Sequence, residues 1–297
     1  MALNLAAPHT WPAAIMPTLV AICAASNVCS LSVTMCCTLL LIVILMQSAV
    51  NTFNDYYDYV KGTDSAEDNV EESDAVLVYN DIDPKSALKL AIGMLAAAFL
   101  LGIYCIVKAG FVPLVIALIG ALFVVAYSAG KSPISYLPLG EVVSGVVMGG
   151  LIPLAAYQVI TGSLDFLMLV KAVPTIIGVG LIMLTNNTCD IERDVLAARK
   201  TLPVLFGRER AIKLYHAAII IWVLAIVFNI AIWYTNGLII VPFMLLASYP
   251  IIRALWFNPM TPERRLQAMP QILSVNVVLG AFYAAALVAP AALSLVL

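Results

Sequence analysis

Charged residues are scarce in this sequence of 297 amino acids, and their scarcity excludes most soluble architectures. Asp, Glu, Lys and Arg make up 11% of the residues, whereas hydrophobic residues make up 63% and the mean hydropathy is +1.03. Soluble domains carry roughly 25% charged residues, so the composition indicates an integral membrane protein. With 15 Lys and Arg residues and a net charge of −2, nucleic acid is not expected as a partner.

Histidine and patterned cysteine are scarce as well. The chain has 2 His, and its 6 Cys form no CxxC pair and have no His nearby in sequence. Neither a zinc site nor a disulfide framework is therefore expected. The first ten residues lack the basic segment, short apolar core and small-residue cleavage site of a secretory signal, so they are expected to form a short tail.

Long apolar runs fill most of the sequence. A spanning helix needs roughly 20 mainly apolar residues, and about nine segments meet that requirement. They are 12–30, 33–59, 85–108, 110–128, 138–160, 166–188, 211–234, 237–256 and 269–295. The sequence thus predicts an all-α integral membrane bundle that forms one domain over residues 1–297.

The polar loops predict an orientation. Loops after the even-numbered spans are long or charged, and loops after the odd-numbered spans are nearly bare. The first group contains Lys61, Lys131, Arg193, Arg199, Lys200, Arg208, Arg210, Arg264 and Arg265. By the positive-inside rule these loops face the cytoplasm, which predicts a multi-pass protein of the cytoplasmic membrane with a cytoplasmic N-terminus.

Two acidic segments close the second and the sixth predicted spans. The first, residues 51–64, reads NTFNDYYDYVKGTD, and the second, residues 186–194, reads NNTCDIERD. An unpaired carboxylate is costly to bury in hydrocarbon, so acidic residues on a spanning helix predict a functional site. Both segments are expected at the cytoplasmic rim of the bundle.

Helical periodicity gathers the polar side chains of each segment on one face. For the first segment these are Asn51, Asp55 and Asp58, with Asn54 beside them; for the second they are Asn187, Asp190 and Asp194. Clustered carboxylates repel one another unless a cation lies between them. Mg²⁺ takes one or two carboxylates together with waters and substrate phosphate oxygens, so the pattern predicts a Mg²⁺-bound diphosphate. Lys61, Lys131, Arg199 and Lys200 are expected to neutralise its remaining charge.

Two other interpretations of the acidic segments stay open. A solvated helix end would explain either segment alone, but explains two matching segments less well. A secondary transporter would also carry intramembrane carboxylates, although near mid-helix and beside Gly or Pro breaks. Here the acids are expected at helix ends with Lys and Arg beside them, which favours diphosphate binding.

The paired segments resemble those of the UbiA superfamily of intramembrane prenyltransferases. The NDxxD motif is matched by Asn54, Asp55 and Asp58, and the DxxxD motif by Asp190 and Asp194. Stretches at 51–64, 126–141, 158–164 and 186–202 are most similar to the branch that prenylates 1,4-dihydroxy-2-naphthoate in menaquinone synthesis.

This resemblance implies that a polyprenyl diphosphate and an aromatic acceptor meet inside a bundle embedded in the lipid bilayer. Mg²⁺ would be held by Asn54, Asp55, Asp58, Asp190 and Asp194. The diphosphate would be contacted by Asn51, Asn54, Lys61, Lys131, Asn187, Arg199 and Lys200. Among these, Lys200 is the leading candidate, and Tyr127 is expected to shield the developing allylic cation or to contact phosphate.

The acceptor is less firmly indicated than the donor. In the naphthoate branch decarboxylation accompanies transfer and gives demethylmenaquinone; 4-hydroxybenzoate, homogentisate, a chlorophyllide and a glycerol-phosphate lipid are the alternatives. The sequence departs from the family pattern at Cys189, where Arg is usual, and at Arg199, where Gly is usual. Residues 65–84 are acidic and contain no Arg, and are expected to be a solvated loop or a lid over the site.

Overall fold

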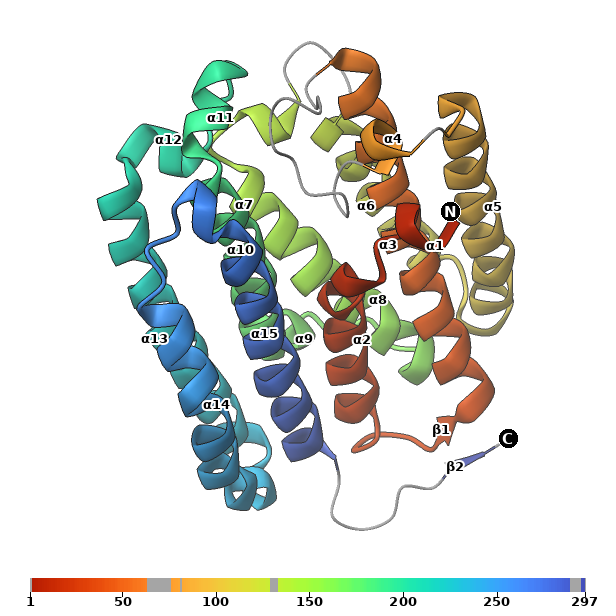
Figure 1. The fold of residues 1–297 in the computed structure, drawn as a ribbon. Coiled ribbons are helices and arrows are strands. Elements are labelled where there is room, and N and C mark those ends of the chain that lie inside the picture. Colours follow the sequence, from red (N-terminus) through yellow and green to blue (C-terminus); the bar gives the residue numbers. More distant parts are fainter. Residues whose placement is uncertain (1, 63–75, 81, 129–132, 289–294, 297) are drawn as a thin grey trace.

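The protein is a bundle of helices that run roughly side by side (Figure 1). The computed structural model describes residues 2–62, 76–80, 82–128, 133–288 and 295–296. Within these ranges the only strand pairing is a short parallel contact of two-residue strands, in which Leu31 and Ser32 lie opposite Leu295 and Val296. Most of the acidic loop 65–84, including any role as a lid, falls outside the described residues.

The elements follow one another as a series of long helices joined by short ones. The first half of the chain forms α1 (Ala2–Leu5), η1 (Pro8–Thr10), α2 (Pro12–Ala25), β1 (Leu31–Ser32), α3 (Val33–Lys61), α4 (Val76–Tyr79), α5 (Pro84–Ala109), α6 (Val112–Ser128), η3 (Ile134–Tyr136), α7 (Gly140–Ser144), the π-helix η4 (Gly145–Leu151) and α8 (Ile152–Thr161). The second half forms α9 (Leu167–Lys171), α10 (Val173–Cys189), α11 (Ile191–Leu196), α12 (Leu202–Phe206), α13 (Arg208–Trp233), η5 (Thr235–Ile240), α14 (Val241–Trp256), η6 (Pro262–Arg264), α15 (Arg265–Leu287) and β2 (Leu295–Val296).

Within the part of the chain that the structure describes, six helical stretches are long and apolar enough to cross a membrane. They are Val33–Val60, Pro84–Ala109, Gly140–Thr161, Arg208–Trp233, Thr235–Trp256 and Pro262–Leu287. Three shorter apolar helices, α2, α10 and Val112–Tyr127, fall in the remaining predicted spans. The helical membrane architecture is therefore confirmed, whereas nine crossings and the orientation of the bundle stay predictions.

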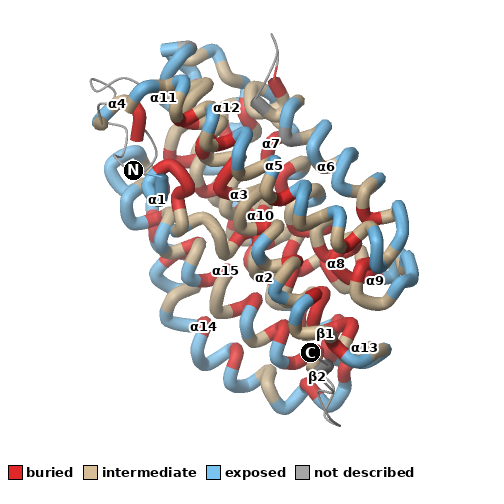
Figure 2. The backbone as a smooth tube through the Cα atoms, turned by 90° about the vertical axis from the view of Figure 1, so that its right-hand side faces the viewer, coloured by how far each residue is buried: buried red, intermediate tan, exposed pale blue. Residues whose placement is uncertain are grey.

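Large hydrophobic side chains face outward along the peripheral helices. Leu100 on α5, Leu122 on α6, Phe228 on α13 and Leu246 on α14 are all exposed. Buried residues gather on the inner sides of the helices (Figure 2). A soluble protein rarely exposes so much contiguous apolar surface, and hydrocarbon is the medium that suits it.

Helix boundaries follow local chemistry. The Ser32 side chain accepts a hydrogen bond from the backbone N–H of Met35 at 3.3 Å and so caps the start of α3. At the other end, Gly62 takes a left-handed conformation (φ 67°), which stops α3 directly after the first acidic segment.

Close backbone contact fixes the position of α10. A Cβ added at Gly145 would lie 2.6 Å from the carbonyl oxygen of Ile176, and one at Gly149 would lie 2.5 Å from its Cα. Only glycine permits this approach of the π-helix η4 to α10. Because the second acidic segment begins in the last turn of α10 and continues directly beyond it, the contact also helps to set the position of that segment.

The two acidic segments lie at the same end of the bundle. The ends of α3 and α10 are found with α4, α11 and α12, and the β1–β2 contact lies at the opposite end (Figure 1). The first residues, expected to be a tail, in fact pack against α3. Leu5 is buried, and its carbonyl accepts a hydrogen bond from the Thr52 hydroxyl at 3.0 Å.

Candidate active site

A cavity of about 730 Å³ begins between the two acidic segments and extends into the bundle. Its polar wall is formed by Asn51, Asn54, Asp55 and Asp58 of α3, Asn186 of α10, Asp190, and Arg193, Arg199 and Arg265. The rest of the wall is mainly Leu, Ile, Val, Met, Ala and Phe side chains, many of them from α3, α5, α6 and α8. The cavity therefore joins a charged end to an apolar chamber.

The first segment presents the predicted face to this cavity. Asp55 is only 6% exposed, and its Oδ1 accepts a hydrogen bond from the backbone N–H of Leu77 at 3.4 Å. Asn51 lines the cavity, but its amide donates to the Thr10 hydroxyl at 2.8 Å and to the carbonyl of Ala6 at 3.1 Å. Asn51 therefore also ties the N-terminal residues to the site, a role that its spacing did not predict.

The second segment presents a different face from the one predicted. The α-helix α10 ends at Cys189, and Asp190 (φ −98°, ψ 16°) separates it from α11. Asn186, Asp190 and Arg193, spaced i, i+4 and i+7, line the cavity. The structure does not support the predicted contact of Asn187 with diphosphate, because Asn187 is not part of the cavity wall and its amide donates to Glu141 Oε1 at 2.9 Å.

Asp194 lies behind the cavity wall formed by the described residues. It is 3% exposed and accepts a hydrogen bond from the Thr201 hydroxyl at 2.9 Å. Burial raises the pKa of Asp194 to about 6, against the opposing effects of the Thr201 hydrogen bond and of the nearby Arg199 guanidinium. A cation close to Asp194 would stabilise its ionised form.

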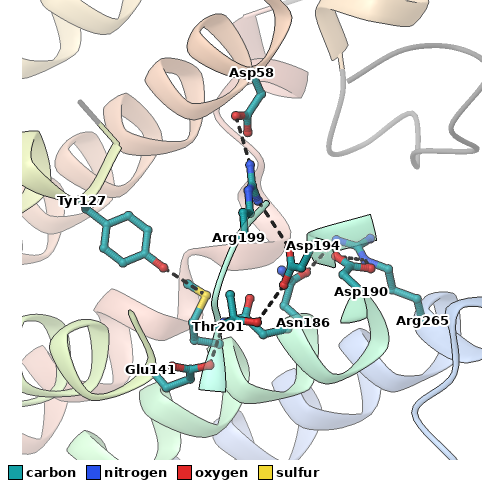
Figure 3. A network of polar contacts seen from close by, with 11 residues as sticks. Asp58, Tyr127, Glu141, Asn186, Asp190, Asp194, Arg199, Thr201 and Arg265 are labelled. Atoms are coloured by element: carbon teal, nitrogen blue, oxygen red, sulfur yellow. Dashed lines mark hydrogen bonds and ion pairs between the residues drawn. The ribbon is translucent and has the colours of Figure 1, made fainter. Parts of the chain in front are cut away.

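Two arginines lie directly against the motif carboxylates. Arg199 is 3.5 Å from Asp58 and 3.8 Å from Asp194, so it spans the two segments. Arg265 is 3.1 Å from Asp190 and donates to Asn186 Oδ1 at 2.7 Å (Figure 3). The polar end of the cavity thus combines carboxylates and guanidinium groups, a combination suited to a metal-bound polyanion.

Comparison with known proteins agrees with this geometry. Residues 14–277 match the model of the UbiA prenyltransferase family. The chain belongs to this family. It is a prenyltransferase and a multi-pass membrane protein.

A bacterial relative is the 1,4-dihydroxy-2-naphthoate octaprenyltransferase of Bacillus subtilis (strain 168), which is 34% identical over 227 residues, 75% of this chain and 72% of that protein. The human UbiA prenyltransferase domain-containing protein 1 is 28% identical over 179 residues, which cover 59% of this chain and 51% of that protein.

Solved UbiA homologues share the fold. One from Archaeoglobus fulgidus superposes with a TM-score of 0.66 at 18% identity, covering 96% of this chain and 97% of the other. One from Aeropyrum pernix K1 superposes with a TM-score of 0.69 at 14% identity, covering 94% and 96%.

The lysines predicted to contact the diphosphate of this UbiA prenyltransferase differ from its arginines, because none of them is found on the cavity wall formed by the described residues. Lys200 is exposed and does not belong to the cavity wall formed by the described residues. Its backbone N–H donates to the carbonyl of Tyr136 at 2.9 Å. Its predicted contact with diphosphate is therefore not supported by its position. Lys131 and the side chain of Lys61 lie outside the described part of the structure, so their contacts stay predictions.

Tyr127 does line the cavity, as its predicted role requires. Its hydroxyl donates to the Met183 sulfur at 3.3 Å, which fixes the ring near the polar end of the chamber. Arg193 and Arg265 also line the cavity, although neither was predicted from the sequence to have a role in the site. The segment containing Arg265 is 75 residues away from Asp190 along the chain, and no local pattern marks it.

The Asn and Asp oxygens of the cavity wall can bind Mg²⁺ only if water and a bound substrate complete its coordination. Among the described residues, no three His, Cys, Asp or Glu side chains gather closely enough to hold a metal ion. Mg²⁺ is commonly held by one or two carboxylates and completed by waters and phosphate oxygens. Asn54, Asp55 and Asp58 on one side and Asp190 on the other supply such partial sets of oxygen ligands.

The chain reaches Arg199 through a Schellman turn at the end of α11. The backbone N–H of Arg199 donates to the carbonyl of Asp194 at 2.8 Å, and that of Ala198 to Val195 at 3.1 Å. This turn puts Ala198 in the left-handed region (φ 55°), where glycine is usual.

Ala198→Gly should therefore stabilise the protein by up to about 1 kcal/mol, because the strain of a left-handed alanine exceeds the entropic cost of glycine. The check is the apparent Tm of the detergent-solubilised protein. Ala197→Gly is the matched control, since Ala197 has φ −79° and should only lose stability. A lower Tm for both variants would contradict the strain at Ala198.

Proposed function

We propose that this UbiA prenyltransferase transfers a polyprenyl group from a polyprenyl diphosphate to 1,4-dihydroxy-2-naphthoate. The carboxylate is lost as CO₂ and inorganic diphosphate is released, so the product is demethylmenaquinol, the reduced form of demethylmenaquinone. The observation that carries the proposal is that two acidic segments from separate helices line one end of a single apolar cavity. The Bacillus subtilis relative acts, by its name, on 1,4-dihydroxy-2-naphthoate, which supports this acceptor.

We place the reaction in the cytoplasmic membrane. Residues 1–297 form one domain with nine crossings, and the acidic end of the cavity and the N-terminus face the cytoplasm. The distribution of Lys and Arg between alternate loops supports this orientation. A water-soluble naphthoate would then reach the site from the cytoplasm, and the prenyl donor would enter from the bilayer.

The polar end of the cavity binds the diphosphate. Asn54, Asp55 and Asp58 would hold Mg²⁺ on the α3 side, and Asp190 would hold it on the α10 side. When bound, Mg²⁺ neutralises the charge that develops on the leaving diphosphate. A homologue from Archaeoglobus fulgidus was solved with GPP and Mg²⁺, and its fold matches with a TM-score of 0.63 at 18% identity, which supports this assignment.

The arginines of the wall orient the leaving group. The guanidinium groups of Arg193, Arg199 and Arg265 face the same end of the cavity as the motif carboxylates. Their forked N–H groups match the geometry of phosphate oxygens, and they cannot lose their charge at neutral pH. They therefore hold the diphosphate while its bond to the allylic carbon breaks.

The apolar chamber holds the prenyl chain and excludes water. Exclusion matters because the allylic carbon becomes cation-like and would otherwise be captured by water. The ring of Tyr127, fixed by its hydrogen bond to Met183, provides an aromatic face for this cation. The electron-rich ring of the acceptor then forms the new C–C bond.

The alternatives are less well supported. Another acceptor of the superfamily would use the same donor site, and a digeranylgeranylglyceryl phosphate synthase shares the fold with a TM-score of 0.61 at 17% identity. For a transporter, the acids should lie near mid-helix. Asp55 and Asp58 instead lie in the last two turns of α3, and Asp190 follows the end of α10.

The test is an acceptor panel. Purified protein would be given a radiolabelled polyprenyl diphosphate, Mg²⁺ and, separately, 1,4-dihydroxy-2-naphthoate, 4-hydroxybenzoate or homogentisate. The expected result is a prenylated product with CO₂ release from the naphthoate alone. Turnover of another acceptor without turnover of the naphthoate would move the assignment to that acceptor.

A further inference from the structure

Arg199 stands between the two acidic segments of the cavity. Its guanidinium is 3.5 Å from Asp58 Oδ1 and 3.8 Å from Asp194 Oδ1, and the side chain is 21% exposed. It also lies 5.0 Å from the centre of the Tyr136 ring (Figure 3 shows its position between the two carboxylates). One positive group therefore contacts both carboxylate clusters at once.

The backbone holds Arg199 in this position. The Schellman turn after α11 fixes the main chain of Arg199 to Asp194, and the next residue is tied to the carbonyl of Tyr136 by its own N–H. The turn is maintained although it keeps Ala198 in a left-handed conformation. Such strain persists only where the surroundings impose it, and it often accompanies a functional position.

Arg199 also covers Asp194. The arginine belongs to the cavity wall, whereas the Asp194 carboxylate is buried behind it and bound to Thr201. An ion in the cavity can reach Asp194 only if the Arg199 side chain moves. By contrast, Asp190 and its partner Arg265 both lie on the wall.

We propose that Arg199 is an exchangeable internal counter-ion, which neutralises Asp58 and Asp194 until a divalent cation with its diphosphate displaces it. The inference rests on the proposed function, because it concerns the same site. The guanidinium and the divalent cation compete for the same carboxylate oxygens. Once displaced, Arg199 lies beside the incoming diphosphate and pairs with it, so its charge is used in both states.

The competition has a consequence for metal affinity. Without a diphosphate, a divalent cation must displace the Arg199 guanidinium, which then has no new partner to replace its lost ion pairs. With a diphosphate, the displaced guanidinium gains a phosphate partner. Arg199 therefore weakens binding of the metal alone and strengthens binding of the metal–diphosphate pair. In this way the residue couples loading of the two ligands.

The experiment measures Mn²⁺ binding to purified full-length protein from the EPR signal of free Mn²⁺, without any prenyl substrate. Arg199→Gln should bind Mn²⁺ about tenfold more tightly than the wild type, because a unit charge within 4 Å of the ligand oxygens is removed. Arg199→Lys keeps the positive charge, so its affinity for Mn²⁺ should stay nearly as low as that of the wild type. Arg210→Gln is the matched control, since Arg210 is an exposed arginine outside the cavity wall.

A second measurement distinguishes competition from a change in folding. Affinity for geranyl S-thiolodiphosphate, an inert analogue, is measured in the presence of saturating Mn²⁺. It should fall about tenfold in Arg199→Gln, opposite in direction to the change for Mn²⁺ alone. A misfolded variant would lose both affinities. Unchanged or weaker Mn²⁺ binding in Arg199→Gln, while Arg199→Lys resembles the wild type, would overturn the proposal.

The two proposals fail in different ways. If the wild type prenylates an aromatic acceptor but Arg199→Gln leaves Mn²⁺ affinity unchanged, only the counter-ion role is wrong. If Arg199→Gln tightens Mn²⁺ binding but the wild type transfers no prenyl group to any aromatic acceptor, the counter-ion role stands and the proposed function fails.

Discussion

Asp55→Asn should lower prenyl transfer by at least about 10³-fold, which corresponds to ~4 kcal/mol of lost transition-state stabilisation. Asp55 is a nearly buried carboxylate on the cavity wall, held towards the site by the backbone N–H of Leu77. Asparagine keeps the shape of the side chain but loses the negative charge that binds Mg²⁺. The check is initial rate at saturating Mg²⁺, with membrane insertion confirmed separately.

Asp190→Asn should have an effect of similar size, since Asp190 supplies the corresponding carboxylate on the α10 side. Glu209→Gln is the matched control, because Glu209 is an exposed acid whose partner is Lys213, 2.7 Å away on the same helix. Near-normal rates in both Asp55→Asn and Asp190→Asn would mean that the acidic segments do not hold the metal.

Arg265→Gln should lower kcat/KM for the prenyl diphosphate by about 10²-fold, or ~3 kcal/mol. Arg265 is on the cavity wall, 3.1 Å from Asp190, and glutamine can neither neutralise the diphosphate nor pair with Asp190. The expected effect is large because the Arg265 guanidinium is mostly buried, so water weakens its interactions little. No other Lys or Arg on α15 can replace its charge.

The neighbouring residue gives a sharp control. Arg264 is exposed, and its guanidinium donates a hydrogen bond to Gln267 Oε1 at 3.0 Å. Arg264→Gln should leave kcat/KM within about twofold of the wild type, as surface charges contribute little. Equal losses for the two variants would point to a general effect of charge at the membrane surface and not to a contact in the site.

The sequence was sufficient to predict the helical membrane architecture and to predict that the two acidic segments lie at the same end of the bundle (Figure 1). Apolar runs of membrane length determine where the helices form, because hydrocarbon leaves the backbone few alternatives. The acidic segments had to lie at helix ends, since their polarity stops the apolar runs. Spacing within one uninterrupted helix was also reliable, since the four Asn and Asp side chains predicted on α3 all line the cavity.

Prediction was less successful where the helix is interrupted. Helical periodicity was extended through Asp190, but α10 ends one residue earlier, and the face that lines the cavity begins at Asn186 instead of Asn187. The Schellman turn after α11 then directs Arg199 into the cavity and leaves Lys200 exposed. Two adjacent basic residues look alike in sequence, and only the turn distinguishes them.

Tertiary contacts account for the remaining differences. Arg265 reaches Asp190 because α15 packs beside α10, and Thr10 reaches the cavity because the N-terminal residues fold back onto α3. Neither contact leaves a local signal, since each depends on how distant segments pack. These contacts also add positive charge and hydrogen bonds that the acidic motifs alone would not predict.

The most direct test of the account is an experimental structure of the protein with Mg²⁺ and geranyl S-thiolodiphosphate. We predict that the diphosphate lies between Asp55 and Asp58 on one side and Asp190 on the other, and that the geranyl chain lies in the apolar cavity. Density for the diphosphate at any other place, or its binding without contact to either acidic segment, would contradict the account.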